Sequence, residues 1–254
     1  MLRAFLIACS FFTILPTPGL KGHEEWHERA MYYFALAMPL VGFIIGLIWA
    51  LCFAVILKLN FNFVLKGVLM ELMAFMITGG IHMDGLMDTC DAIFSRKDRE
   101  TRLNILHDTH TGAFAVMGCV FIILLKSALF AEIFYRLNNL NFNLIAALIC
   151  TPLFARLGMA IYFNSMPYAK RGITTSLGEQ RDRKHSIYLI ILACVIAALN
   201  IYLGNYALPL AWLIIFLLWR FICFKIFGGI AGDLLGAFAE LSESILILSI
   251  AAGM

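Results

Sequence analysis

The sequence predicts an all-α, polytopic integral membrane protein with about six or seven transmembrane helices. Of its 254 residues, 62% are hydrophobic and only 14% are charged, whereas soluble domains average about 45–50% and about 25%. The mean hydropathy is +0.90. The apolar runs are continuous instead of alternating with a period of two, which disfavours a transmembrane β-barrel. This composition excludes a soluble globular domain and a disordered chain.

Six apolar runs are long enough to cross a bilayer, which takes about 20 residues. They cover residues 32–57, 61–81, 112–135, 140–163, 187–203 and 206–227. A weaker run, 244–253, closes the chain. The apolar segment that follows Arg3 ends at Pro16 and is short, so we expect it to lie in the membrane interface or to re-enter. No repeat or low-complexity linker divides residues 1–254, which we expect to form a single membrane-embedded domain.

The distribution of cations predicts the orientation. Three polar segments, 82–111, 164–186 and 228–243, fall on the same side of the membrane if the run 61–81 ends in the cytoplasm. That side then holds thirteen cations: Arg3, Lys21, Arg29, Arg96, Lys97, Arg99, Arg102, Lys170, Arg171, Arg181, Arg183, Lys184 and Lys225. The other side holds three: Lys58, Lys66 and Arg136. The positive-inside rule therefore places all three polar segments in the cytoplasm. The net charge of only +3 argues against a nucleic-acid-binding surface.

Carboxylates gather where the run 61–81 ends. Asp84, Asp88 and Asp91 follow one another at i, i+4 and i+7, so on a helix they form one stripe. Stacked like charges repel one another unless a cation lies between them. Magnesium fits such a stripe, because it binds one or two protein carboxylates and keeps its other positions for water and phosphate oxygens. The alternative is a set of solvated acids at a helix start, but the apolar residues between the three aspartates favour a metal site.

Further candidates lie in the same polar segment. Asp108 could act as a general base or as a fourth metal carboxylate. His107 and His110 could serve as acid, base or phosphate contacts. The charged stretch 96–102 is typical of a solvated helix face.

The other two polar segments contain groups suited to a phosphorylated ligand. Lys170 and Arg171 follow Tyr168 and could hold phosphate oxygens, although they could equally be a positive-inside anchor. The glycine-rich stretch 228–237 contains Gly232 and Asp233 but lacks a Walker lysine, so we expect close helix packing or an unwound helix end.

Charged residues also fall inside the apolar runs, where they are costly unless they are paired or face a polar cavity. They are Glu71, Lys126, Glu132, Arg156 and Arg220. Of these, Arg156 is the one that we expect to contact substrate, and the others are interpreted as structural.

Five motifs carry a family resemblance, of which the run from Gly79 to Ala92 and the stretch 232–237 are the specific ones. The others are the early Phe12-Thr13-Ile14-Leu15-Pro16-Thr17-Pro18 and the stretches 108–112 and 167–170. Together they resemble the cobalamin synthase family over nearly the whole chain. The chain departs from the usual family pattern at His110, where an arginine is usual, and at Ala92, where a glycine is usual.

The resemblance implies a magnesium-dependent enzyme of the bacterial inner membrane. A hydroxyl of α-ribazole, or of its 5′-phosphate, attacks the cobinamide-side phosphorus of adenosylcobinamide-GDP, and GMP leaves. The implied metal ligands are Asp84, Asp88 and Asp91, with Asp84, Asp88 and Asp108 as catalytic residues. The candidate substrate-binding residues are His82, Arg96, His110, Arg156, Lys170, Arg171, Gly232 and Asp233. A homo-oligomer is compatible with the sequence.

Two other functions remain to be separated from this one. The stretch 88–96 comes close to the signature of CDP-alcohol phosphotransferases, but the glycine and two aspartates that should follow are Ile105, Thr109 and Ala113. A secondary transporter would use intramembrane charges such as Glu71 and Lys126. The gathering of carboxylates on one side and the lack of an inverted repeat argue against a transporter.

Overall fold

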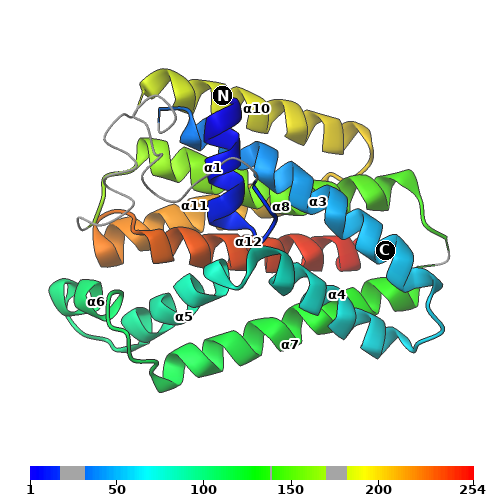
Figure 1. Ribbon diagram of the computed structural model, residues 1–254, viewed down its shortest axis with the longest axis horizontal. Coiled ribbons are helices and arrows are strands. Elements are labelled where there is room, and N and C mark those ends of the chain that lie inside the picture. Colours follow the sequence, from blue (N-terminus) through cyan, green and yellow to red (C-terminus); the bar gives the residue numbers. More distant parts are fainter. Residues whose placement is uncertain (18–31, 138, 170–181) are drawn as a thin grey trace.

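The computed structural model describes residues 1–17, 32–137, 139–169 and 182–254. In chain order the helices are α1 (Leu2–Phe12), α3 (Phe34–Lys58), α4 (Phe63–Thr78), α5 (Ile81–Phe94), α6 (Arg99–Ile105), α7 (Ala113–Arg136), α8 (Phe142–Ser165), α10 (Arg183–Tyr202), α11 (Ala207–Ile222), the π-helix η2 (Cys223–Phe227) and α12 (Gly232–Ala252). The long helices run side by side in one bundle (Figure 1).

Six helices of the described ranges are long and apolar enough to cross a membrane: α3, α7, α8, α10, α11 with η2, and α12. A seventh crossing results if α4 and α5 are counted as one span bent by 95°. The predicted multi-pass, all-helical class is therefore confirmed. Helix α1 has 11 residues, too few to cross, which agrees with the expected short N-terminal segment.

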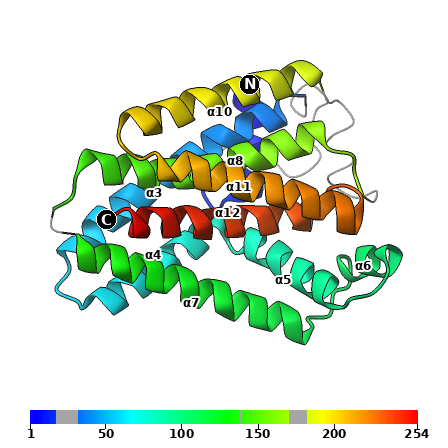
Figure 2. The same ribbon diagram turned by 180° about the vertical axis from the view of Figure 1, so that it is seen from behind.

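Most of the described loops lie at one or the other of the two ends of the bundle (Figures 1 and 2). The α6 end carries α6, the loop 107–112 and the turn 228–231 between η2 and α12. The far end carries the loops 59–62, 139–141 and 203–206 together with the C-terminus. Lys58, Lys66 and Arg136, the three cations that the sequence assigns to the non-cytoplasmic side, all lie at or beside the far end.

The bend between α4 and α5 follows from two consecutive glycines. Gly79 ends α4 at φ 63° and Gly80 precedes α5 at φ 80°, both in the left-handed region that costs other residues free energy. The bend lies partway along the bundle, and α5 then continues toward the α6 end (Figure 1). The predicted polar segment 82–111 thus begins with a helix, α5, which together with α4 is long and apolar enough for one bent crossing. Its location on the cytoplasmic side stays a prediction.

Helix α12 is also longer than predicted. The sequence predicted a polar segment 228–243 followed by a weak apolar run, whereas one helix runs from Gly232 to Ala252. The prediction failed because Glu240 and Glu243 lower the local hydropathy although both side chains are buried against cations of neighbouring helices. Helices α8 and α12 form the centre of the bundle, with 78% of each spanning window buried.

Helices α5 and α12 pack in close contact. A Cβ atom added to Gly85 would lie 2.8 Å from the Asp233 carbonyl oxygen and 2.9 Å from its Cα. On the other side of the contact, a Cβ atom on Gly236 would lie 3.2 Å from the His82 Cα. Small residues of this kind let membrane helices approach closely, where packing drives their association.

We predict that Gly85→Ala destabilises the protein by about 1–3 kcal/mol, because its methyl group would overlap the backbone of α12 and force the two helices apart. The free energy of unfolding would be measured by titrating SDS into mixed micelles. Gly253→Ala, at the C-terminal end of the same helix α12 and without such an overlap, is the control and should change it little. Equal losses in the two variants would contradict this packing.

Candidate active site on helices α5 and α12

Three carboxylates from α5 and α12 come together, and we call Asp84, Asp88 and Asp233 the acidic group. Asp84 is exposed in the first turn of α5, whereas Asp88 and Asp233 are half-buried. The charge on Asp233 is repelled by Asp88 and Asp84, and Asp88 is also repelled by Asp91 and Asp108. The backbone contact at Gly85 explains this proximity. Within the described residues no cation forms an ion pair with any member of the acidic group.

Asp91 makes two hydrogen bonds to another helix that its spacing on α5 does not indicate. Its Oδ2 accepts a hydrogen bond from the Gly112 N–H at 2.7 Å, and its Oδ1 accepts one from the Ala115 N–H at 2.9 Å. Both oxygens thus cap the N-terminus of α7, where unpaired N–H groups and the helix dipole favour a negative charge. Asp91 therefore joins α5 to α7, and Asp233 is a further carboxylate close to Asp84 and Asp88; the metal-binding role of Asp91 stays a prediction.

Asp108 lies in the exposed loop that leads to α7. Its Oδ1 lies 2.7 Å from the His110 Nδ1 and accepts a hydrogen bond from the His110 backbone N–H at 3.0 Å. These contacts hold the pKa of Asp108 below its usual value, because both stabilise the ionised carboxylate. Asp108 is therefore well suited to orient a hydroxyl group and poorly suited to keep a proton.

Two predicted substrate-binding residues lie inside the protein instead of at its surface. His82 is 2% exposed, its ring packs against that of Phe12 at 5.6 Å, and its Nε2 has no hydrogen-bond partner among the described residues. Arg156 is 1% exposed and is paired with Glu243, not with the acidic group. Arg156 is paired with Glu243 because an arginine inside a membrane bundle needs a counter-charge there.

The remaining candidates lie around the α6 end. Arg96 is exposed in the turn between α5 and α6 and adopts a left-handed φ of 55°. Gly232 is exposed at the start of α12, and the N-cap residue Ala231 supplies no side-chain hydrogen bond to this helix end. Lys170 and Arg171 lie outside the described residues.

The segment just before residue 170 is hydrogen-bonded to the turn that precedes Asp233. The Ile230 N–H donates to the Pro167 carbonyl and the Ala169 N–H donates to the Ile230 carbonyl, each at 2.9 Å. This bridge holds the segment 167–169 against the turn that precedes Asp233.

Sequence reasoning missed Arg99, which was interpreted as part of a solvated face. The guanidinium group of Arg99, on α6, lies directly against Gly228, in the turn before α12, where a Cβ atom would overlap it. Nothing in the local sequence of α6 indicates this contact, because the partner is distant in the chain.

The acidic group fits magnesium bound together with a phosphorylated ligand. In the part of the chain that the structure describes, no three His, Cys, Asp or Glu side chains converge as a complete metal-binding set. Magnesium commonly takes one or two protein carboxylates and fills its other positions with water and phosphate oxygens. Asp84 and Asp88, with Asp233 beside them, could therefore hold it, whereas a cage made only of protein ligands is absent from these residues.

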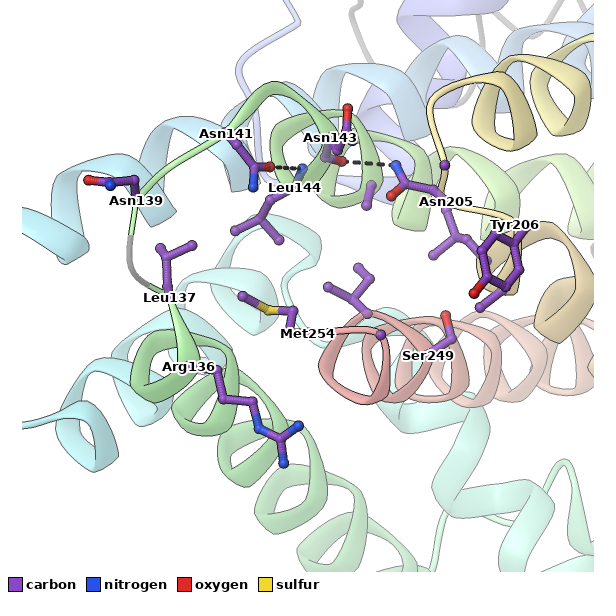
Figure 3. A pocket seen from close by; sticks show the side chains of 16 residues that line it. Arg136, Leu137, Asn139, Asn141, Asn143, Leu144, Asn205, Tyr206, Ser249 and Met254 are labelled. Atoms are coloured by element: carbon purple, nitrogen blue, oxygen red, sulfur yellow. Dashed lines mark hydrogen bonds between the residues drawn. The ribbon is translucent and has the colours of Figure 1, made fainter.

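A pocket of about 540 Å³ lies at the far end and is unconnected with the acidic group. Figure 3 shows Arg136, Asn141, Asn205, Tyr206 and Ser249 around it. Its polar side chains serve the backbone in part, since Asn141 caps α8 and Asn205 donates to the Asn143 carbonyl. None of its lining residues belongs to the acidic group.

Fold and site define a multi-pass helical membrane protein in which carboxylates of two helices, α5 and α12, come together. The chain belongs to the cobalamin-5-phosphate synthase family, whose sequence profile matches residues 4–251. It is 31% identical to the adenosylcobinamide-GDP ribazoletransferase of Clostridium botulinum (strain Alaska E43 / Type E3), covering 98% of this chain and 97% of the relative.

Two further relatives carry the same name. The Clostridium perfringens (strain SM101 / Type A) protein is 33% identical over 98% of each chain. The Brevibacillus brevis (strain 47 / JCM 6285 / NBRC 100599) protein is 32% identical over 97% of each chain. No solved structure is similar to this chain at a significant level.

The capping role of Asp91 leads to a stability prediction. Asp91→Ala should lower the free energy of unfolding by about 1 kcal/mol, the usual cost of losing a helix cap. Asp88→Asn should leave it unchanged or raise it, because this change relieves repulsion within the acidic group. SDS titration of the two purified variants measures both effects, and a stability loss in Asp88→Asn as large as that in Asp91→Ala would contradict the assignment.

Proposed function

We propose that this protein is an adenosylcobinamide-GDP ribazoletransferase, which joins the adenosylcobinamide-phosphate group to α-ribazole, or to its 5′-phosphate, with release of GMP. Family membership over nearly the whole chain and the names of the relatives support this proposal. The observation that carries it structurally is the acidic group, in which two family-like motifs, around Asp84 and Asp233, come together. This reaction completes the nucleotide loop of cobalamin.

Asp84 and Asp88, with Asp233 beside them, are the residues that would hold magnesium. The metal would neutralise negative charge on the pyrophosphate of adenosylcobinamide-GDP. In turn, the three carboxylates exclude a pyrophosphate group that arrives without a cation, because like charges repel at this distance. Magnesium thus becomes a condition for substrate binding and not only for the reaction.

Asp108 is assigned to the incoming nucleophile. Its carboxylate, kept ionised by His110, accepts a hydrogen bond from the α-ribazole hydroxyl and points the oxygen at the cobinamide-side phosphorus. The new P–O bond forms as the P–O bond to GMP breaks. Because Asp108 is exposed and a weak base, the hydroxyl proton passes to water.

Cationic and backbone donors are assigned to the phosphate oxygens. The uncapped N-terminus of α12 at Gly232 offers N–H groups and the positive end of a helix dipole. Lys170 and Arg171 are assigned to this role from the sequence alone; the described chain before them ends at Ala169, whose N–H donates to the Ile230 carbonyl. Arg99, which lies against Gly228 in the turn before α12, and Arg96, in the turn before α6, add positive charge at the α6 end of the bundle. His82 and Arg156 act from inside the bundle and not by contact with substrate.

The bacterial inner membrane is the proposed location, with the α6 end in the cytoplasm. The described cations Arg96, Lys97, Arg99, Arg102 and Lys184 all lie in or beside the loops of that end. The far end has Lys58, Lys66 and Arg136. The positive-inside rule relates this asymmetry to the cytoplasm.

The direct test is incubation of the detergent-purified protein with adenosylcobinamide-GDP, α-ribazole and magnesium. We expect cobalamin and GMP to form without any vesicle, an outcome that a secondary transporter would not give. Release of CMP from a CDP-alcohol, with no GMP released from adenosylcobinamide-GDP, would instead favour the phospholipid enzyme.

Asp88→Asn should lower turnover at saturating magnesium by about 10²-fold or more, because a lost electrostatic contact in the transition state costs that much. Initial rates of GMP release measure the effect. Glu100→Gln, which removes an exposed acid from the same end of the bundle, is the matched control and should retain activity. Near-parental turnover of Asp88→Asn would contradict the assignment of Asp88 to magnesium.

A further inference from the structure

A buried ionic network joins four helices beneath the acidic group. Lys126 on α7 lies 3.0 Å from Glu240 and 3.4 Å from Glu243, both on α12, and 3.4 Å from Glu71 on α4. Arg156 on α8 is paired with Glu243. All five side chains are less than a tenth exposed. We call these five residues the buried network.

Lys126 is the centre of the buried network. An ammonium group has three N–H donors, and three carboxylates surround this one. Its Nζ also lies 5.8 Å from the centre of the Trp49 ring on α3, within the range of a cation–π contact. A single side chain therefore relates α3, α4, α7 and α12 to one another.

The network is connected to the acidic group along one face of α12. Asp233, Gly236, Glu240 and Glu243 are spaced i, i+3, i+7 and i+10, so they share one stripe of this helix. Gly236 and the Asp233 backbone contact α5, while Glu240 meets Lys126 on α7. Turning α12 by one residue, about 100°, would separate Lys126 from Glu240 and move Asp233 away from Asp84 and Asp88.

Helix α7 is bound both to α5 and to α12, the two helices that carry the acidic group. Asp91 fixes its N-terminus to α5, and Lys126 fixes its middle to α12. Phe238 packs α12 against Tyr162 on α8 and Phe216 on α11, whereas toward α5 the helix presents Gly236, which has no side-chain atoms that could set its rotation there. A buried ion pair adds little net stability compared with apolar residues of similar size, but its geometry can specify one arrangement.

We infer that Lys126 is a positioning residue: by binding Glu240 it fixes the rotation of α12, so that Asp233 faces Asp84 and Asp88 and the metal-binding carboxylates are complete. The inference rests on the proposed function, since it assigns these carboxylates to a metal. Lys126, which the sequence analysis interpreted only as structural, thereby acquires a role in the geometry of the site.

The test measures metal affinity without substrate, by titrating Mn²⁺ into detergent-purified protein and following free Mn²⁺ by electron paramagnetic resonance. Lys126→Met should weaken Mn²⁺ binding about ten-fold or more, as loss of a residue that supports metal ligands typically does. The control is Arg136→Met, which breaks the exposed Glu132–Arg136 ion pair on the same helix and should leave the affinity unchanged.

A second variant separates positioning from folding. The triple change Glu71→Gln, Lys126→Met and Glu240→Gln leaves only the balanced pair of Glu243 and Arg156, so it removes the cost of unpaired buried charge. We expect its thermal unfolding midpoint to recover relative to Lys126→Met while Mn²⁺ binding stays about ten-fold weak. Recovery of parental Mn²⁺ affinity together with stability would overturn the inference, because the network would then serve folding alone.

Glu240→Asp keeps every charge and tests the geometry even if the other variants fold poorly. It shortens the carboxylate that meets Lys126, so we expect weaker Mn²⁺ binding and a raised KM for magnesium with kcat largely retained at saturating magnesium. Unchanged affinity in this folded variant would overturn the inference. If the parent protein binds Mn²⁺ and releases GMP while all variants match it, only this inference fails; if the parent does neither, the proposed function fails as well.

Discussion

A charge inside a bilayer needs a counter-charge or water, and this constraint sorts seven carboxylates of the described helices into three sets. Glu71, Glu240 and Glu243 are buried against the two cations of the buried network. Asp91 is neutralised by the N-terminus of α7. The acidic group remains without a cation among the described residues, which is the condition in which carboxylates bind a metal ion.

The sequence was sufficient for the class of fold, because hydropathy reports directly on burial in lipid. It also located the aspartates of α5, whose spacing along one helix is a local property. It placed the boundaries of α12 wrongly, since a count of apolar residues treats Glu240 and Glu243 as solvent-exposed whether or not a cation lies beside them. Only the positions of Lys126 and Arg156 on other helices make these glutamates compatible with the bundle interior.

The contacts of Asp91 and Asp233 were likewise beyond reach of the sequence. Periodicity on α5 groups Asp91 with Asp84 and Asp88, but it contains no information about which helix end lies beside each side chain. The Gly112 and Ala115 N–H groups that Asp91 accepts from belong to another helix, as does Asp233, which lies close to Asp84 and Asp88. Contacts of this kind, between residues far apart in the chain, are the part of the site that spacing alone does not reveal.

The bend between α4 and α5 has a consequence for hydration. Asp84 is exposed in the first turn of α5, directly after the two glycines of the bend. A charge inside a bilayer needs water or a counter-charge beside it. If α4 and α5 cross the membrane as one bent span, this carboxylate has to be reached by water from the α6 end, so the protein has to hold an aqueous entry between helices that are otherwise packed against one another.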